Sequence, residues 1–289
     1  MGAVEARHRS LVEIHVAVFL FGFPGLFGKW LALPPALIVF GRVLFASLAL
    51  AGVMAAGRRP FRVAPRRDLA LLVACGFILA VHWTFFFKSV QVSSVAVGLL
   101  AYSSFPVFTA FLEPLLAREK WDPASLVFAL FCVLGIGLIV PGFDLSNAVV
   151  QGVLWGLAAG LTFSLLSVLN RGLASRHSSL AVAFYQDLFA VLFLIPAVVR
   201  GGLPYSGRDW ALIAVLGVFC TAAAHTLFIE GMKGVGARTA SVLSSLEPVY
   251  GILLAVVFLK ENPSLRTVSG GVIVLAAAAA ATVRARRAR

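Results

Sequence analysis

Residues 83–119 read WTFFFKSVQVSSVAVGLLAYSSFPVFTAFLEPLLARE, and residues 225–261 read HTLFIEGMKGVGARTASVLSSLEPVYGILLAVVFLKE. The second stretch begins 142 residues after the first, and the two align without a gap. The matched positions include a proline and a basic-acidic pair: Pro106 with Pro248, and Arg118-Glu119 with Lys260-Glu261. Chance similarity between apolar segments rarely produces such matches, so we interpret the pattern as an internal repeat.

The composition excludes an ordinary soluble protein. Of the 289 residues, 61% are hydrophobic and 12% are charged, whereas soluble domains carry about 25% charged residues. A membrane-spanning helix needs about 20 mostly apolar residues. The chain holds ten such runs, joined by short connections: roughly 11–33, 36–56, 69–89, 93–116, 124–142, 152–172, 181–199, 210–231, 236–259 and 266–283. We therefore predict an all-α integral membrane protein with ten transmembrane helices.

The basic residues predict the orientation of these helices. With the N-terminus inside, 17 of the 24 Lys and Arg residues fall on the inner side and 5 on the outer side. Cytoplasmic connections carry the excess of Lys and Arg, so we expect both termini in the cytoplasm. The tail around Arg284 then meets anionic inner-leaflet lipid, and the net charge of +12 needs no nucleic-acid partner. A signal peptide is the rival interpretation of the first 35 residues.

The repeat divides the chain into residues 1–147 and 148–289, each with five predicted spans. Because five is odd, the second half must cross the bilayer in the opposite sense. Such inverted repeats exchange inward-open and outward-open arrangements around a substrate held near the middle of the membrane. A ridge of small residues, Gly152, Gly156 and Gly160, predicts that the sixth span approaches another helix closely.

Ten spans arranged as five plus five, a proline within the fourth span of each half, the Glu247-Pro248 pair and the basic-acidic ends of the repeat resemble the EamA-type branch of the drug/metabolite transporter superfamily. The resemblance covers the whole chain and is to bacterial amino-acid and metabolite exporters, aromatic amino-acid exporters among them. It implies export by alternating access through a cavity lined mainly by the third, fourth, eighth and ninth spans. One departure is that Phe105 stands in the first half where the second has Glu247, which puts in doubt any coupling scheme that needs two acids there.

Charged residues within the spans are the first candidates for function, because a charge at a helix centre costs about 2.5–3.5 kcal/mol. Four are singled out: Lys29, Arg42, Asp187 and Glu247. Lys29 lies near the outer end of its span and can reach the headgroups. For Arg42 and Asp187, structural pairing and substrate contact are both open. Glu247 is the deepest acid and is a candidate partner for a proton or a substrate ammonium group.

The prolines of the repeat predict two kinks. Pro106 and Pro248 have no N–H, so each leaves the carbonyl one turn earlier without its helical partner. The hydroxyls beside the kinks are predicted to bind the polar end of the substrate: those of Ser103, Ser244 and Ser245. The alternative is that the kinks serve packing only and that the serines bond back to their own helices.

Aromatic and histidine side chains complete the predicted cavity lining: His82, Trp83, Tyr102, Phe163, Tyr185 and Tyr250. Helix packing is the alternative for each. The histidines have no second ligand at metal-binding spacing, so we expect no metal and no cofactor.

Three classes of function remain to be weighed. A secondary transporter is favoured, since the chain has no phosphate-binding loop and no room for a nucleotide-binding domain. An intramembrane enzyme is disfavoured because no HExxH or GxSxG motif is present. A passive channel stays open. Small amphipathic metabolites, most simply aromatic or neutral amino acids, are the predicted substrates, with drugs, nucleosides and organic cations as alternatives. A monomer and a homodimer are equally compatible with the sequence.

Overall fold

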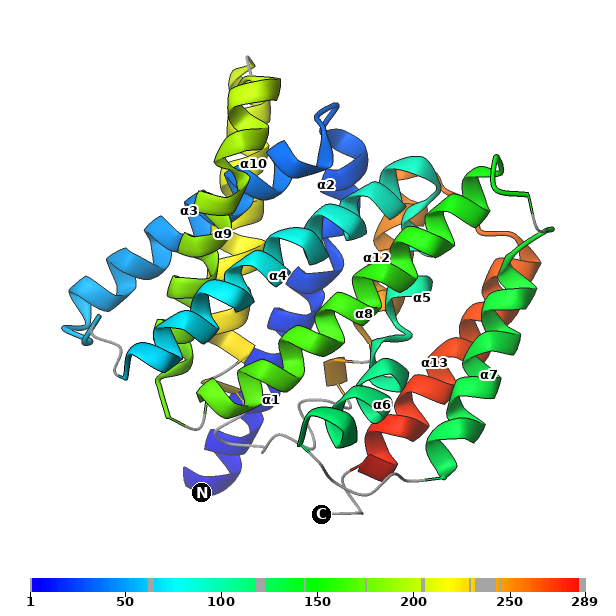
Figure 1. The fold of residues 1–289 in the computed structure, drawn as a ribbon, viewed down its shortest axis with the longest axis horizontal. Coiled ribbons are helices and arrows are strands. Elements are labelled where there is room, and N and C mark those ends of the chain that lie inside the picture. The colour runs from blue at the N-terminus through cyan, green and yellow to red at the C-terminus, as the bar shows by residue number, and fades with distance from the viewer. Residues whose placement is uncertain are drawn as a thin grey trace.

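The computed structural model describes residues 2–61, 65–117, 123–142, 144–174, 176–203, 206–228, 230–231, 243–244 and 246–285. Within these ranges all regular secondary structure is helical. Helix α1 (Gly2–Gly22) begins and helix α13 (Leu265–Ala285) ends at the same end of the molecule (Figure 1), which we call the terminal end. The opposite end is called the distal end.

The remaining helices follow the predicted apolar runs. The first half contains α2 (Pro24–Trp30), α3 (Pro35–Ala56), α4 (Arg66–Val92), α5 (Val95–Tyr102), α6 (Phe105–Ala117) and α7 (Ala124–Ile139). The second half contains α8 (Ala148–Ala174), α9 (Ser179–Gly201), α10 (Gly207–Gly217), the π-helical segment η1 (Val218–Ala223), α12 (Glu247–Leu254) and the π-helical segment η2 (Ala255–Leu259).

Seven helical stretches are long and apolar enough to cross a membrane, and they coincide with seven of the predicted spans: His8–Trp30, Pro35–Ala56, Arg66–Val92, Val95–Leu116, Ala148–Asn170, Ser179–Gly201 and Gly207–Phe228. Shorter apolar helices stand at the positions of the fifth, ninth and tenth predicted spans: Ala124–Ile139, Glu247–Leu259 and Leu265–Ala280. The beginning of the ninth predicted span, up to residue 242, lies outside the described residues. The helical membrane fold is therefore confirmed, and the count of ten spans stays a prediction.

The fourth predicted span is interrupted rather than bent. Helix α5 ends and α6 begins on either side of a turn formed by Ser103 and Ser104. Proline has no N–H to donate and clashes with the preceding helical turn, so the chain restarts its helix at Phe105, with Pro106 in the first turn. A similar break precedes Pro24, between α1 and α2. The predicted kink at Pro106 thus has the right place, but its form is a complete break in the helix.

The ninth predicted span repeats this interruption. Ser244 is helical, Leu246 lies in a turn, and α12 begins at Glu247 with Pro248 next to it. At the repeat offset, Leu246 corresponds to Ser104 in the first half. Both halves therefore break the same helix at the same place.

The glycine ridge brings α8 against α5. A Cβ atom at Gly152 would lie 2.1 Å from Ser93 Oγ, and one at Gly156 would lie 2.5 Å from Ala101 Cβ. A Cβ at Gly160 would come within 3.0 Å of the turn after α5. Larger residues therefore do not fit, and the predicted close approach of the sixth span is confirmed.

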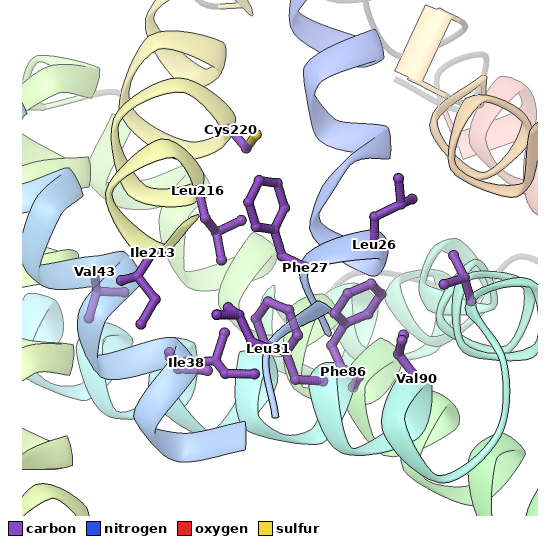
Figure 2. Close-up of a cluster of buried hydrophobic side chains, with 14 of the residues drawn as sticks. Leu26, Phe27, Leu31, Ile38, Val43, Phe86, Val90, Ile213, Leu216 and Cys220 are labelled. Carbon is purple, nitrogen blue, oxygen red and sulfur yellow. The ribbon is translucent and has the colours of Figure 1, made fainter. Parts of the chain in front are cut away.

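The largest buried apolar cluster lies in the distal half of the helices. Side chains of α2, α3, α4 and α10 meet in it (Figure 2), among them Leu26, Phe27, Ile38, Phe86 and Leu216. Lipid tails are as apolar as these side chains, so close packing contacts hold the helices together here. The distal ends of the two halves are thus joined by a dense apolar core.

Replacing Gly156 by valine should lower the thermal stability of the purified protein. The new side chain would collide with Ala101 and approach the Gly98 carbonyl of α5, and overpacking of this kind costs about 1–3 kcal/mol. Gly137 in α7 provides the matched control, because a Cβ there meets no atom within 4 Å. Thermal unfolding in detergent compares G156V with G137V; equal midpoints would contradict the close packing of α8 on α5.

Candidate functional site

A cavity of about 500 Å³ runs from the middle of the helices toward the terminal end. Tyr102 and Glu247, at the two helix breaks, line its inner part, while Ser167, Phe228 and Val283 line it nearer the terminal end. Its wall is built from α1, α5, α6, α8, α12, α13 and the helical residues around 225–228. The interrupted helices of both halves therefore meet at one cavity.

Seven of the residues predicted from the sequence lie in this wall: Tyr102, Ser103, Pro106, Phe163, Ser244, Glu247 and Pro248. The lining is mostly apolar and aromatic. Among its described residues Glu247 is the only charged side chain, and Phe105, its counterpart in the repeat, lies in the same wall. The two halves therefore differ at the cavity itself, where the second half has an acid and the first has a phenylalanine.

The serines at the first break bond to their own helix. Ser103 Oγ donates to the Leu99 carbonyl at 2.7 Å, and Ser104 Oγ donates to the Ala101 carbonyl at 2.6 Å. This is the packing alternative of the sequence analysis, in which the serines bond back to their own helix. The same two carbonyls also accept the backbone N–H groups of Ser103 and Ser104. Ser103 can still accept a hydrogen bond through its oxygen. Ser245 lies outside the described residues.

His82 lies behind the cavity wall and is fully buried. Its Nδ1 donates to the Ala159 carbonyl of α8 at 2.9 Å, because a carbonyl oxygen can only accept. Its ring lies 5.5 Å from the ring of Tyr102 and 5.1 Å from that of Phe163, both of which line the cavity. His82 therefore supports two residues of the wall and is separated from the cavity by them.

The buried Arg42 and the half-buried Trp83 form a pair next to His82. The Arg42 guanidinium carbon lies 3.4 Å from the centre of the Trp83 ring, which is cation–π geometry. Arg42 Nε donates to Thr221 Oγ1 of η1 at 2.7 Å. The Thr221 carbonyl in turn accepts from Nδ1 of His225, a cavity residue, at 3.0 Å. Arg42 thus stands one helical turn behind the cavity wall.

The remaining predicted site residues lie away from the cavity. Asp187 is buried in α9, where it interacts electrostatically with Arg42. The Tyr185 hydroxyl donates to the Phe61 carbonyl, and the Tyr250 ring packs edge-on against Phe19 of α1. Tyr185 and Tyr250 therefore serve helix packing in this structure.

Polar contacts at the distal end connect the two halves. Both carboxylate oxygens of Glu261, from the second half, accept the backbone N–H of Val95 at 3.1 and 3.0 Å. Val95 opens α5 in the first half, and a carboxylate at a helix N-terminus is stabilised by the helix dipole. Within the first half, Lys29 Nζ donates to the Ser93 carbonyl at 2.7 Å, instead of only reaching the headgroups. We call these contacts the distal seal.

A second polar cluster joins the halves at the terminal end. Asp68, which is buried at the start of α4, accepts from Arg176 Nε and Nη2 at 2.9 Å each and lies 2.7 Å from His177 Nε2. The hydrogen bonds that Arg176 donates to Asp68 raise the pKa of Arg176, so the guanidinium stays charged at every physiological pH. This cluster fixes α4 to the connection between α8 and α9.

Sequence reasoning missed three kinds of functional residue. Phe21 and Ser167 line the cavity but look like ordinary apolar or small residues of a span. Thr221 holds Arg42 from a π-helical segment that no pattern in the sequence marked. In the sequence, Glu261 stood out only as the last residue of the internal repeat. Its match with Glu119 was the one pattern that could have pointed to a role for it.

Replacing Glu261 by glutamine should loosen the distal seal. A hydrogen bond to a charged group contributes about 1.5–3 kcal/mol, which corresponds to at least about a tenfold rise in opening. Opening is measured as the labelling rate of a cysteine placed at Leu26, which is fully buried in the distal half, by a membrane-impermeant maleimide. The three native cysteines are buried and give little background. Asp144→Asn, an exposed acid at the same end, is the control; equal labelling in all variants would mean that Glu261 does not hold this end closed.

The comparisons with known proteins agree with a transporter. The EamA-like transporter family model matches residues 10–140 and again residues 150–283. The chain is 28% identical to the uncharacterized transporter YxxF of Bacillus subtilis, covering 97% of this chain and 91% of that protein. It is 26% identical to the pseudopaline exporter CntI of Pseudomonas aeruginosa, covering 85% of each. It is 27% identical to the aromatic amino acid exporter YddG of Ancylobacter novellus, covering 73% of this chain and 75% of that protein.

These relatives bear transporter names and none bears the name of an enzyme. The repeated match spans most of the chain, and the matched segments contain the apolar helices. The chain therefore belongs to the EamA-like transporter family and is a multi-pass transporter of the bacterial inner membrane, not an enzyme.

Proposed function

We propose that the chain exports small metabolites, most simply aromatic or neutral amino acids, by alternating access. In this proposal it crosses the membrane ten times in two inverted halves, residues 1–147 and 148–289, with both termini in the cytoplasm. The basic residues of the inner connections support that orientation. The inner side then contacts anionic lipid, and the transporter works as a monomer or a homodimer.

The observation that carries the proposal is that the cavity extends toward one end of the molecule only. It extends toward the terminal end, whereas the distal end is filled by the apolar cluster and tied by the Glu261 contact to Val95. With the termini in the cytoplasm, this is the inward-facing arrangement of an exporter. A continuous channel would need an opening through the distal seal, so the arrangement favours a gated transporter.

The matching helix breaks support a mechanism based on inverted repeats. Transporters of this kind place their substrate near the middle of the membrane, beside interrupted helices. Here the breaks before Pro106 and Pro248 both border the cavity. Motion of one half against the other would close the terminal end and open the distal end around the same site.

The lining supports an amphipathic substrate. Aromatic rings of Tyr102, Phe105 and Phe163 offer an apolar surface, and Glu247 offers one carboxylate for an ammonium group. An aromatic or neutral amino acid matches both features. The name of the relative YddG agrees with this choice, while that of CntI names a different cargo, so drugs, nucleosides and organic cations stay as alternative substrates.

An efflux panel tests the substrate class. Cells that express the chain should resist toxic analogues of aromatic and neutral amino acids, compared with cells that carry an empty vector. The same cells are challenged with nucleoside analogues and cationic drugs. Resistance confined to these other compounds would overturn the amino-acid assignment.

Glu247→Gln should abolish most of this resistance, because it removes the only charged group of the described cavity lining. Resistance and radiolabelled amino-acid efflux are compared at equal surface expression. Glu5→Gln, which neutralises an exposed acid of α1, is the matched control and should behave like the wild type. Unimpaired efflux by E247Q would remove Glu247 from the mechanism.

A further inference from the structure

Two buried side-chain nitrogens in the described part of the chain lack a hydrogen-bond partner: Arg42 Nη1 and His82 Nε2. Both belong to side chains that contact Trp83. The Arg42 guanidinium lies 3.4 Å from the centre of the Trp83 ring, and the rings of His82 and Trp83 lie 4.9 Å apart. The unsatisfied atoms are therefore concentrated around one residue, next to the cavity.

The Arg42 guanidinium is incompletely coordinated for a buried charge. Its side chain is 1% exposed, and its polar contacts are the neutral hydroxyl of Thr221 and the face of Trp83. The nearby acids Asp187 and Glu247 act on it electrostatically, but no ion pair within 4.0 Å joins either of them to Arg42 among the described residues. A buried cation without a bonded anion is costly. An anionic group bound at Nη1 would remove that cost.

His82 presents the complementary group. Its Nδ1 carries the proton that it donates to Ala159, so in the neutral ring Nε2 is a bare acceptor. The Trp83 neighbourhood thus holds one free donor with a positive charge and one free acceptor.

A free donor and a free acceptor match the head group of an amino acid. A carboxylate accepts from a guanidinium, and an ammonium group donates to an imidazole nitrogen. Tyr102 and Phe163, whose rings contact His82, line the cavity that would hold the substrate side chain. These two rings, which we call the partition, lie between the cavity and His82, so the head group reaches His82 only when one of them rotates.

We propose that Arg42 and His82 form the subsite for the zwitterionic head of the transported amino acid, with the carboxylate on Arg42 Nη1 and the ammonium on His82 Nε2. The inference rests on the proposed function and assigns specificity within it. Glu247, on the cavity side of the partition, then meets the ammonium group before the head group passes to Arg42 and His82. Trp83 and Thr221 hold the guanidinium in place. The subsite selects zwitterions over molecules that carry only one of the two charges.

The test uses three probes that share one side chain: L-phenylalanine, L-phenylalaninamide, which lacks the carboxylate, and 3-phenylpropionate, which lacks the ammonium group. Binding to the purified protein is measured by ligand-induced thermal stabilisation, and transport by counterflow in proteoliposomes. The wild type should bind each single-charge probe at least about tenfold more weakly than phenylalanine, because each loses a charge-assisted hydrogen bond.

Arg42→Gln should weaken phenylalanine binding by at least about tenfold and leave phenylalaninamide within about twofold, so that the two probes bind alike. Arg42→Lys keeps the charge and should retain part of the preference. Arg208→Gln, at an exposed arginine of α10, is the matched control and should keep the wild-type ranking. A purely structural role for Arg42 would weaken both probes equally, and that result would overturn the inference.

The wild-type ranking tests the inference even where R42Q does not fold. Equal binding of phenylalanine and its amide by the wild type would contradict the subsite, as would stabilisation by sodium chloride equal to that by phenylalanine. Failure of the wild type to exchange phenylalanine or any other neutral amino acid would contradict the proposed function itself. Counterflow without the predicted effect of Arg42 would contradict only the subsite.

Discussion

The hydrocarbon of a membrane offers no water to backbone N–H and C=O groups, and the rest of this structure depends on that constraint. It favours helices for every crossing and allows an interrupted helix only beside protein or a cavity. The breaks in the fourth and ninth predicted spans obey it, since both border the cavity, and the serine hydroxyls of the first break bond to carbonyls of α5. Pro106 and Pro248 would leave unpaired backbone groups in a lipid-facing helix, but here they border the cavity.

The charged groups at the two ends of the molecule are paired differently from those in the middle. At the terminal end, Asp68 is paired with Arg176 and His177; at the distal end, Glu261 caps α5 across the two halves. These contacts satisfy their charges within the protein. In the middle, Arg42 keeps an unpartnered nitrogen and Glu247 faces the cavity. Paired charges thus hold the scaffold, while incompletely paired ones are left where a ligand can complete them.

Features that depend on neighbours in sequence could be predicted. Apolar runs located the helices, Pro106 and Pro248 located the breaks, and the glycine ridge of the sixth span located a close helix contact. Residue type alone did not show which side chains line the cavity. Tyr185 and Tyr250 were chosen as aromatic residues of suitable spans, yet they pack against α1 or bond to a neighbouring segment.

The sequence by itself determined the helical membrane fold, the internal repeat and the places where helices end, because hydropathy, proline and glycine act within a few residues of chain. Only the tertiary structure decided that the cavity extends to one end, that Glu261 seals the other, and that Arg42 meets Trp83 and Thr221. Arg42 and Thr221 are 179 residues apart, and a π-helical segment sets their contact. Side-chain partners at such separation depend on how whole helices pack, which no local pattern encodes.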